Sequence, residues 1–208
     1  MNYRFAQYGC GLSAPEDWLN FDASPTLRIQ RTPVLNVLLR PKPVFPANVR
    51  YGDIIKGLPL KEGELEGIYC SHVLEHLSLD DFRVALRNTY KVLKPGGIFR
   101  MVLPDLEFYA RTYLDELSGG DKLAAMRFIR QSMLGIEHRP RGLGGMVRSF
   151  LGNSHHLWLW DYSSLAAELA AVGFRDIRRC AYNDGPEVFK AVEEHGRFVN
   201  CLAIECYK

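Results

Sequence analysis

The stretch His72-Val-Leu-Glu-His76 carries two histidines and a glutamate at a spacing that could do metal chemistry. In the inverted zinc-protease pattern HxxEH, the two histidines bind a metal ion and the glutamate acts as a base. That chemistry needs the motif inside a helix and a third ligand further along the chain. Here the motif directly follows an apolar strand-like segment, and the first helix-capping signal comes later, at Ser78. The sequence therefore predicts no metal site, and a metallohydrolase is kept only as an alternative.

The elements around this motif predict a βαβ unit. An apolar strand over Leu65–Cys70 is followed by a helical pattern that begins at Ser78, then by a Pro-Gly-Gly turn and a second strand over Ile98–Leu103. Helical spacing predicts that the helix turns five residues toward the sheet: Phe82, Ala85, Leu86, Thr89 and Val92. The two strands of such a unit are parallel, and ligands bind at the carboxyl ends of parallel strands. At the first of these ends stand Cys70, Ser71 and His72. The pattern predicts an α/β enzyme with a cleft.

Two glycines and two acids extend this predicted cleft toward the N-terminus. Gly9 and Gly11 flank Cys10 after a strand that we expect over Tyr3–Tyr8, and they allow a sharp turn and close backbone approach to a ligand. Asp22 ends a second strand, where its carboxylate could accept hydrogen bonds from ribose hydroxyls or cap the Ser24-Pro25 turn. A helix is expected to start at this turn, and Pro33 is expected to break or kink it. Asp53 follows a third short strand, over residues 49–51.

The paired segments SHVLEHL and VLKPGGIFRMVLPD resemble the core signature of the small class I S-adenosylmethionine (SAM)-dependent methyltransferases. The segments Tyr8-Gly-Cys-Gly11 and Trp18-Leu-Asn-Phe-Asp22 resemble the nucleotide-binding half of the same family. The resemblance covers Tyr3–Phe108 and resumes over His155–Phe174. It implies a single Rossmann-like domain over residues 1–208, with seven mostly parallel strands, an antiparallel last strand and a helical insertion after the fifth strand.

The resemblance also implies SAM as the cofactor and assigns it a set of contacts. The methionine part would lie against the glycine turn, the ribose against Asp22, and the adenine against Asp53 and Ile54. Glu75 and His76 are expected to form hydrogen bonds around the turn that follows the fourth strand. The implied cofactor-binding residues are Gly9, Cys10, Gly11, Asp22, Ala23, Asp53, Ile54, Cys70, Ser71 and His72. Only six residues, 12–17, separate the glycine turn from the second strand, so the usual first helix is missing. This shortened unit leaves open a protein that binds SAM or a nucleotide without catalysis.

Three histidines are the candidate general bases for a hydroxyl acceptor, namely His72, His155 and His156. The last two precede a helix that Asp161 is expected to cap and Gly173 to end, and Trp160 just before it is expected in the core. Between them and the fifth strand, we expect residues 104–156 to form a substrate-covering insertion with two helices. Arg139, Arg141 and Arg148 in this insertion could bind an anionic acceptor or could simply be solvated.

The composition limits the possible cellular locations and binding partners of the protein, but it does not identify the methyl acceptor. A net charge of +2 gives no electrostatic argument for nucleic acid or a membrane, and no apolar run is long enough to span a bilayer. The five cysteines form no CxxC pair, and the N-terminus has no apolar signal-peptide core. We therefore expect a reduced, cytoplasmic enzyme that transfers a methyl group to oxygen or nitrogen of a small molecule. The oligomeric state is not predicted.

Overall fold

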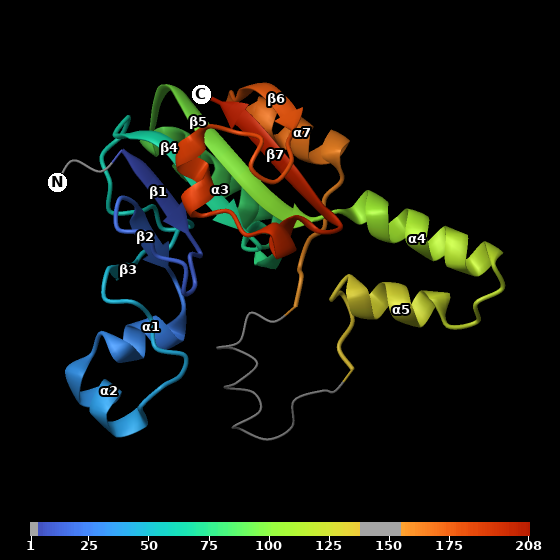
Figure 1. Ribbon diagram of the computed structural model, residues 1–208, viewed down its shortest axis with the longest axis horizontal. Helices are drawn as coiled ribbons and strands as arrows, with labels where there is room; N and C mark the ends of the chain where they lie inside the picture. Colours follow the sequence, from blue (N-terminus) through green and yellow to red (C-terminus); the bar gives the residue numbers. More distant parts are fainter. Residues whose placement is uncertain (1–3, 138–154) are drawn as a thin grey trace.

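A computed structural model describes residues 4–137 and 155–208. Its centre is a seven-stranded sheet in the order β3-β2-β1-β4-β5-β7-β6. Only β7 runs antiparallel to its neighbours, as the sequence predicted. The strands are β1 (Phe5–Tyr8), β2 (Leu19–Asp22), β3 (Val49–Tyr51), β4 (Leu65–Ser71), β5 (Leu93–Pro104), β6 (Arg175–Arg179) and β7 (Cys201–Tyr207). A mostly parallel sheet with one antiparallel strand is what the sequence resemblance implies (Figure 1).

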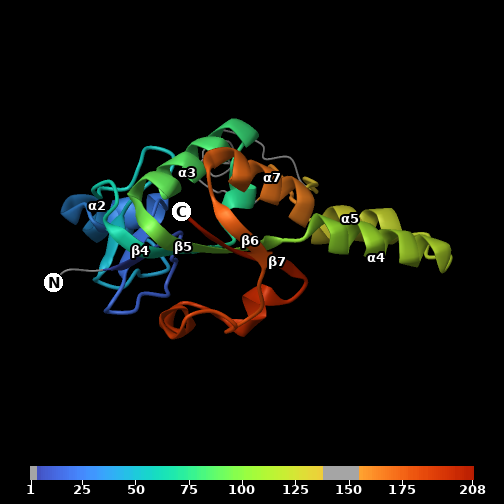
Figure 2. The ribbon, with the colours of Figure 1, turned by 90° about the horizontal axis from the view of Figure 1, so that it is seen from above.

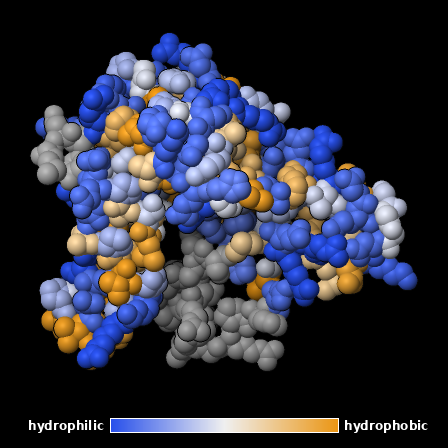
Figure 3. Space-filling model, in the orientation of Figure 1, coloured by the Kyte–Doolittle hydropathy of each residue, from blue (hydrophilic) through white to orange (hydrophobic). Residues whose placement is uncertain are grey.

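The chain passes from β1 to β2 without a helix, as the short connection predicted. Helix α1 (Pro25–Gln30) then begins after Ser24, whose side chain accepts a hydrogen bond from the Thr26 N–H. Pro33 was expected to break or kink a helix, but it instead opens a second one, α2 (Pro33–Leu39), because proline fits the first helical turn. Helix α2 buries none of its residues and carries exposed apolar side chains, visible at the lower left of Figure 3.

The predicted βαβ unit is present between β4 and β5. A short 3₁₀ turn, η1 (Leu74–His76), follows β4, and α3 (Leu79–Val92) begins only after Ser78, whose Oγ accepts the Asp81 N–H. The buried side of α3 is the one its periodicity predicted, Phe82, Ala85, Leu86, Thr89 and Val92. Strand β5 is longer than predicted, because it begins at Leu93 and includes the Pro-Gly-Gly segment.

The two faces of the sheet are covered differently (Figure 2). One face packs against α3 and α7 (Tyr162–Val172), which are joined by the Arg83–Glu168 ion pair. Helix α7 begins at Asp161 and ends at Gly173, as predicted. The other face is covered by the segment between β6 and β7, which contains two 3₁₀ turns, η2 (Glu187–Ala191) and η3 (His195–Phe198).

Two helices follow β5 and extend away from the sheet (Figures 1 and 2). These are α4 (Leu106–Ser118) and α5 (Ala124–Gln131), close to the two that the sequence predicted. They contact each other through the rings of Tyr113 and Phe128 and through the Arg127–Glu116 ion pair. Among the described residues, no helix is long and apolar enough to cross a membrane.

Candidate active site

A cavity of about 530 Å³ lies at the carboxyl ends of β1, β2, β3 and β4, where a parallel sheet is expected to bind its ligand. Six of the residues predicted to bind the cofactor line it: Gly9, Asp22, Ala23, Asp53, Ile54 and His72. Eight further residues line the cavity that the sequence had not indicated as cofactor-binding: Tyr8, Ser24, Pro25, Gly52, Ile55, Val73, His76 and Leu77. Most of these residues are next to a predicted residue in the sequence. Their position beside a strand end was therefore the signal from which they could have been predicted.

The glycine turn is fixed by packing as well as by its backbone. Gly9 has a φ of +65°, and a Cβ atom placed on it would lie 2.1 Å from Val73 Cγ2. Only glycine therefore fits here. Gly11 also has a positive φ, +54°, but open space surrounds it. Its N–H donates to Asp22 Oδ2 at 3.0 Å, which ties the turn to the end of β2.

Asp22 serves the local fold and also faces the cavity. Its Oδ1 accepts the Ser24 N–H at 2.7 Å, while Oδ2 accepts the Gly11 N–H. Each carboxylate oxygen has a second lone pair, so these bonds leave acceptor capacity for ribose hydroxyls. The residue is 8% exposed. The capping alternative and the ribose alternative are thus geometrically compatible.

Asp53 and Ile54 form the third edge of the cavity. The Asp53 side chain accepts the Ile55 N–H at 3.0 Å and lies 3.7 Å from Lys56 Nζ. Ile54 is 5% exposed and belongs to the main apolar core, so its position is rigid. The placement of both is consistent with an adenine-binding edge.

Four predicted cofactor residues lie away from this cavity. Cys10 and Cys70 are buried within apolar clusters, so their side chains serve the core. Ser71 faces a smaller neighbouring cavity, and Gly11 lines neither cavity. Backbone contacts from these four residues to the cofactor stay predictions.

His72 directly follows β4 in a left-handed conformation, with a φ of +54°. Its Nε2 lies 3.0 Å from the Arg197 carbonyl oxygen, and its Nδ1 lies 3.3 Å from Glu75 Oε1. Burial lowers the pKa of His72, but contacts with Cys201, Glu75 and the Arg197 carbonyl outweigh it and raise that pKa to about 10. These contacts favour the protonated, positively charged ring at neutral pH, whereas a general base must be neutral.

Glu75, His76 and His156 converge beside the cavity, and we call them the Glu75 cluster. The Nε2 atoms of His76 and His156 each lie 4.0 Å from Glu75 Oε1. The sequence argument expected Glu75 to hydrogen-bond around the turn. That expectation is wrong for the described residues, because neither carboxylate oxygen has a hydrogen-bond partner among them. His156 was predicted as a base, but its approach to Glu75 was not.

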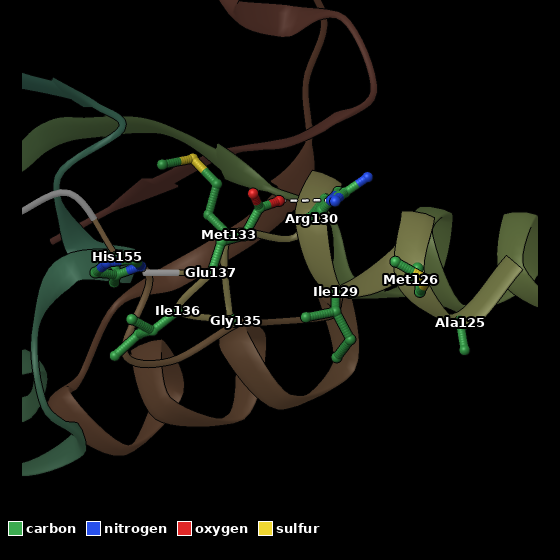
Figure 4. Close-up of a pocket in the computed structure, with 9 residues that line it drawn as sticks. All are labelled: Ala125, Met126, Ile129, Arg130, Met133, Gly135, Ile136, Glu137 and His155. Carbon is green, nitrogen blue, oxygen red and sulfur yellow. Dashed lines mark hydrogen bonds and ion pairs between the residues drawn. The ribbon is translucent and has the colours of Figure 1, made fainter. Parts of the chain in front are cut away.

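His155 and His156 face different surroundings. His155 lines a second cavity, also about 530 Å³, formed by α5 and the segment after it (Figure 4). Figure 4 shows it at the opposite end of that cavity from Ala125 and Met126. His156 is 8% exposed, and burial lowers its pKa. Trp160, expected in the core, is 3% exposed there. The predicted anion-binding residues Arg139, Arg141 and Arg148 lie outside the described residues.

Comparison with known proteins agrees with this fold. Residues 8–101 match a family model described as a methyltransferase domain. A SAM-dependent methyltransferase from Thermotoga maritima, described as a possible histamine N-methyltransferase, aligns with a TM-score of 0.51 and 17% identity over 99% of this chain and 82% of its own. A SAM-dependent methyltransferase from Archaeoglobus fulgidus aligns with a TM-score of 0.50 and 17% identity over 99% and 86%. No curated protein matches the sequence.

The protein is a Rossmann-like transferase by its fold, by the cavity at its strand ends and by the domain that its sequence matches. The chain matches the methyltransferase domain model over residues 8–101, slightly less than half of its length, and it has the fold of SAM-dependent methyltransferases. It is an enzyme whose methyl donor is S-adenosylmethionine. The sequence-based assignments of family, fold and cofactor are confirmed.

Proposed function

We propose that this enzyme transfers the methyl group of SAM to an oxygen or nitrogen of a small-molecule acceptor. The observation that carries the proposal is the strand-end cavity, which gathers Gly9, Asp22, Asp53 and His72 from four successive strands. The enzyme's task in such a transfer is to align the acceptor with the methyl group and exclude water. SAM itself supplies the activated methyl group.

The cavity fits SAM in size and in polarity. Its volume of about 530 Å³ lies within the range typical of small-molecule sites. Asp22 would receive the ribose hydroxyls, and Asp53 the adenine amino group with Ile54 against the ring. The open turn at Gly9 would lie along the methionine part. The chain has no first helix whose N-terminus could face the cofactor carboxylate, so that contribution to affinity is absent here.

The three candidate bases are not equally suited to remove a proton from a hydroxyl. Both ring nitrogens of His72 face acceptors, and its pKa is raised to about 10, so it suits charge stabilisation better than proton removal. His156 is almost fully buried beside Glu75. His155 is only half-buried and lines a cavity large enough for a small acceptor, which favours it. An amine acceptor that arrives neutral would need no base.

We also retain residues 104–156 as the part that sets acceptor choice, within a single domain over residues 1–208. The described portion of this insertion provides α4, α5 and the lining of the second cavity. An anionic acceptor would meet the arginines at 139, 141 and 148. Five free cysteines fit a reducing compartment such as the cytoplasm.

The test is calorimetric titration with S-adenosylhomocysteine, the demethylated product. Wild-type protein should bind it. Asp22→Asn should weaken binding by about 1–3 kcal/mol, because the amide cannot accept the same set of hydrogen bonds. Asp17→Asn is the matched control, since Asp17 is exposed and lines no part of the cavity. Wild-type protein that fails to bind at millimolar ligand would refute the proposed site. If Asp22→Asn bound as tightly as wild type, the ribose role of Asp22 would be lost.

A further inference from the structure

The Glu75 cluster brings three hydrogen-bond acceptors together, and among the described residues no hydrogen bond joins them. The ligand-forming atoms of Glu75, His76 and His156 all lie within 4.8 Å of one another. The two imidazole rings pack edge to face, with centroids 5.0 Å apart. Like-signed partial charges facing each other in a buried place are unfavourable unless a positive centre compensates them.

The hydrogen bonds of the two histidines fix which ring nitrogen is free. His76 Nδ1 lies 3.0 Å from the His155 carbonyl oxygen, and His156 Nδ1 lies 2.8 Å from the Ser132 carbonyl oxygen. A carbonyl oxygen can only accept, so each Nδ1 carries a hydrogen and donates it. In the neutral ring, Nε2 then presents a lone pair, and both Nε2 atoms face Glu75 Oε1. Metal-binding histidines are oriented in this way, by donating their other N–H to a carbonyl or carboxylate.

The carboxylate of Glu75 strengthens the case for a cation. Its side chain is 0% exposed, and neither oxygen accepts a hydrogen bond from any described residue. Buried charges in proteins are paired or coordinate a metal ion. His72 Nδ1 is the rival partner, 3.3 Å from Oε1, but its orientation does not satisfy hydrogen-bond geometry. Even with His72 charged, no described residue donates a hydrogen bond to the Nε2 atom of either of the other two histidines.

We infer that Glu75, His76 and His156 bind one divalent transition-metal ion, with zinc as the best match. Two imidazoles and one carboxylate form a recurrent ligand set for zinc that leaves a coordination position open. Zinc bonds of about 2.0–2.2 Å place tetrahedral ligand atoms about 3.3–3.5 Å apart. Each of the two Nε2–Oε1 distances of 4.0 Å must therefore shorten by about half an ångström, and the two Nε2 atoms, which lie within 4.8 Å of each other, must reach the same spacing through side-chain rotations. Magnesium, which prefers oxygen ligands, fits this set poorly.

The sequence argument rejected a metal because His72 and His76 need not share a helical face. His72 indeed precedes η1, so it does not share a helical face with His76, and it is not one of the three proposed ligands. The missing third ligand comes instead from His156, eighty residues after His76 in the chain. The ligand set is therefore His76, Glu75 and His156 rather than the HxxEH triplet of the protease pattern.

The metal would sit beside the cofactor, because His76 also lines the strand-end cavity. If the proposed function holds, the open coordination position could bind an acceptor hydroxyl and lower its pKa, in place of a protein base. Metal binding itself does not depend on that role, so it can be tested without SAM or an acceptor.

The experiment uses the full chain, stripped with a chelator and dialysed, and titrated with zinc chloride by calorimetry. We expect saturable binding of one zinc per chain and a rise in melting temperature with zinc. His156→Gln should weaken zinc binding at least tenfold, and Glu75→Gln likewise. His155→Gln is the matched control, because the neighbouring side chain faces the other cavity and is not among the ligands. Cobalt should give the visible absorption of a tetrahedral ion in wild type and lose it in His156→Gln.

Absence of saturable zinc binding up to millimolar zinc would overturn the inference. So would equal zinc affinity in wild type and His156→Gln, since the ion would then bind elsewhere. Titration with S-adenosylhomocysteine separates this from the proposed function. His156 does not line the cofactor cavity, so His156→Gln should still bind S-adenosylhomocysteine. Cofactor binding without zinc binding would reject the metal site alone, and zinc binding without cofactor binding would reject the proposed cofactor site alone.

Discussion

The Arg100 guanidinium on β5 lies 2.6 Å from the Glu193 carboxylate, and each side chain is 1% exposed. The same guanidinium lies 2.6 Å from Glu205 on β7 and 3.1 Å from Asp184. These contacts hold the segment between β6 and β7 against a sheet face that no long helix of the described residues covers. One buried cation thus neutralises carboxylates from two parts of the chain.

Arg100→Met should therefore destabilise the protein by about 3–5 kcal/mol, because buried Glu193 loses its counter-charge and buried Glu205 keeps only the exposed Arg178. Chemical denaturation followed by circular dichroism measures the change. Arg178→Met is the control, since Arg178 also pairs with Glu205 but is 42% exposed, and such pairs contribute up to about 1 kcal/mol. Equal losses from the two variants would mean that burial of Arg100 does not determine its contribution.

Gly9→Ala should cost about 1–3 kcal/mol of stability, since the new methyl group meets Val73 and the left-handed backbone is strained. Gly11→Ala has similar backbone strain but no clash, so it should cost only about 1 kcal/mol. Adding Val73→Ala to Gly9→Ala should remove the clash and narrow the difference. A Gly9→Ala variant as stable as Gly11→Ala would show that the turn can shift freely.

The buried thiols should make the protein sensitive to alkali. Burial raises the pKa of Cys10 from 9.0 to about 12, and it also raises the pKa values of Cys70 and Cys206. A raised folded-state pKa favours the neutral thiol, so its stabilisation is complete below about pH 9 and is lost as pH rises toward 12. The free energy of unfolding, measured in urea, should fall across that window.

The same thiols should resist alkylation, because the thiolate is the reactive form. In native protein at neutral pH, iodoacetamide should modify Cys10, Cys70 and Cys206 slowly, and mass spectrometry of peptides would locate the label. In denaturant all five cysteines should react. Rapid native labelling of Cys70 would contradict its burial at 1% exposure.

Asp161→Ala should cost about 1 kcal/mol, because the Asp161 side chain caps α7 by accepting the Ser164 N–H at 2.7 Å. Hydrogen bonds from Ser164 lower the pKa of Asp161 below its usual 3.8. This stabilisation is therefore present above that pH and is lost as pH falls through the lower folded value. Asp161→Asn keeps a capping oxygen and should lose little at neutral pH. Thermal melts of the three proteins compare these effects.

Local sequence signals predicted most of the fold. Ser78, Asp161 and Gly173 marked helix ends where the structure has them, because caps act within a few residues. The spacing of Phe82, Ala85 and Leu86 identified the buried side of α3 for the same reason. Pro33 was misjudged, since proline stops a helix from within but also starts one.

The site was predictable where it depends on strand ends and less so where it depends on distant segments. Asp22, Asp53 and His72 reach the cavity because parallel strands end at one edge. The contact of His156 with Glu75 depends on how the chain returns after α5, which no local pattern encodes. The burial of Cys10 and Cys70 likewise depends on which way their side chains point from the turn and strand.

The small buried surface of helices α4 and α5 has a consequence for their local stability. Helix α4 buries no residue, and α5 buries only Ala124, so opening these helices exposes little apolar surface. Their link to the rest of the molecule includes Ser132 and Met133, whose carbonyls accept the Nδ1–H and backbone N–H of His156. Amide hydrogens of α4 and α5 should consequently exchange through sub-global opening, while those of β4 and β5 wait for global unfolding. Because His156 joins the two regions, an ion held at Glu75 should slow exchange at the end of α5 without altering exchange in the central strands.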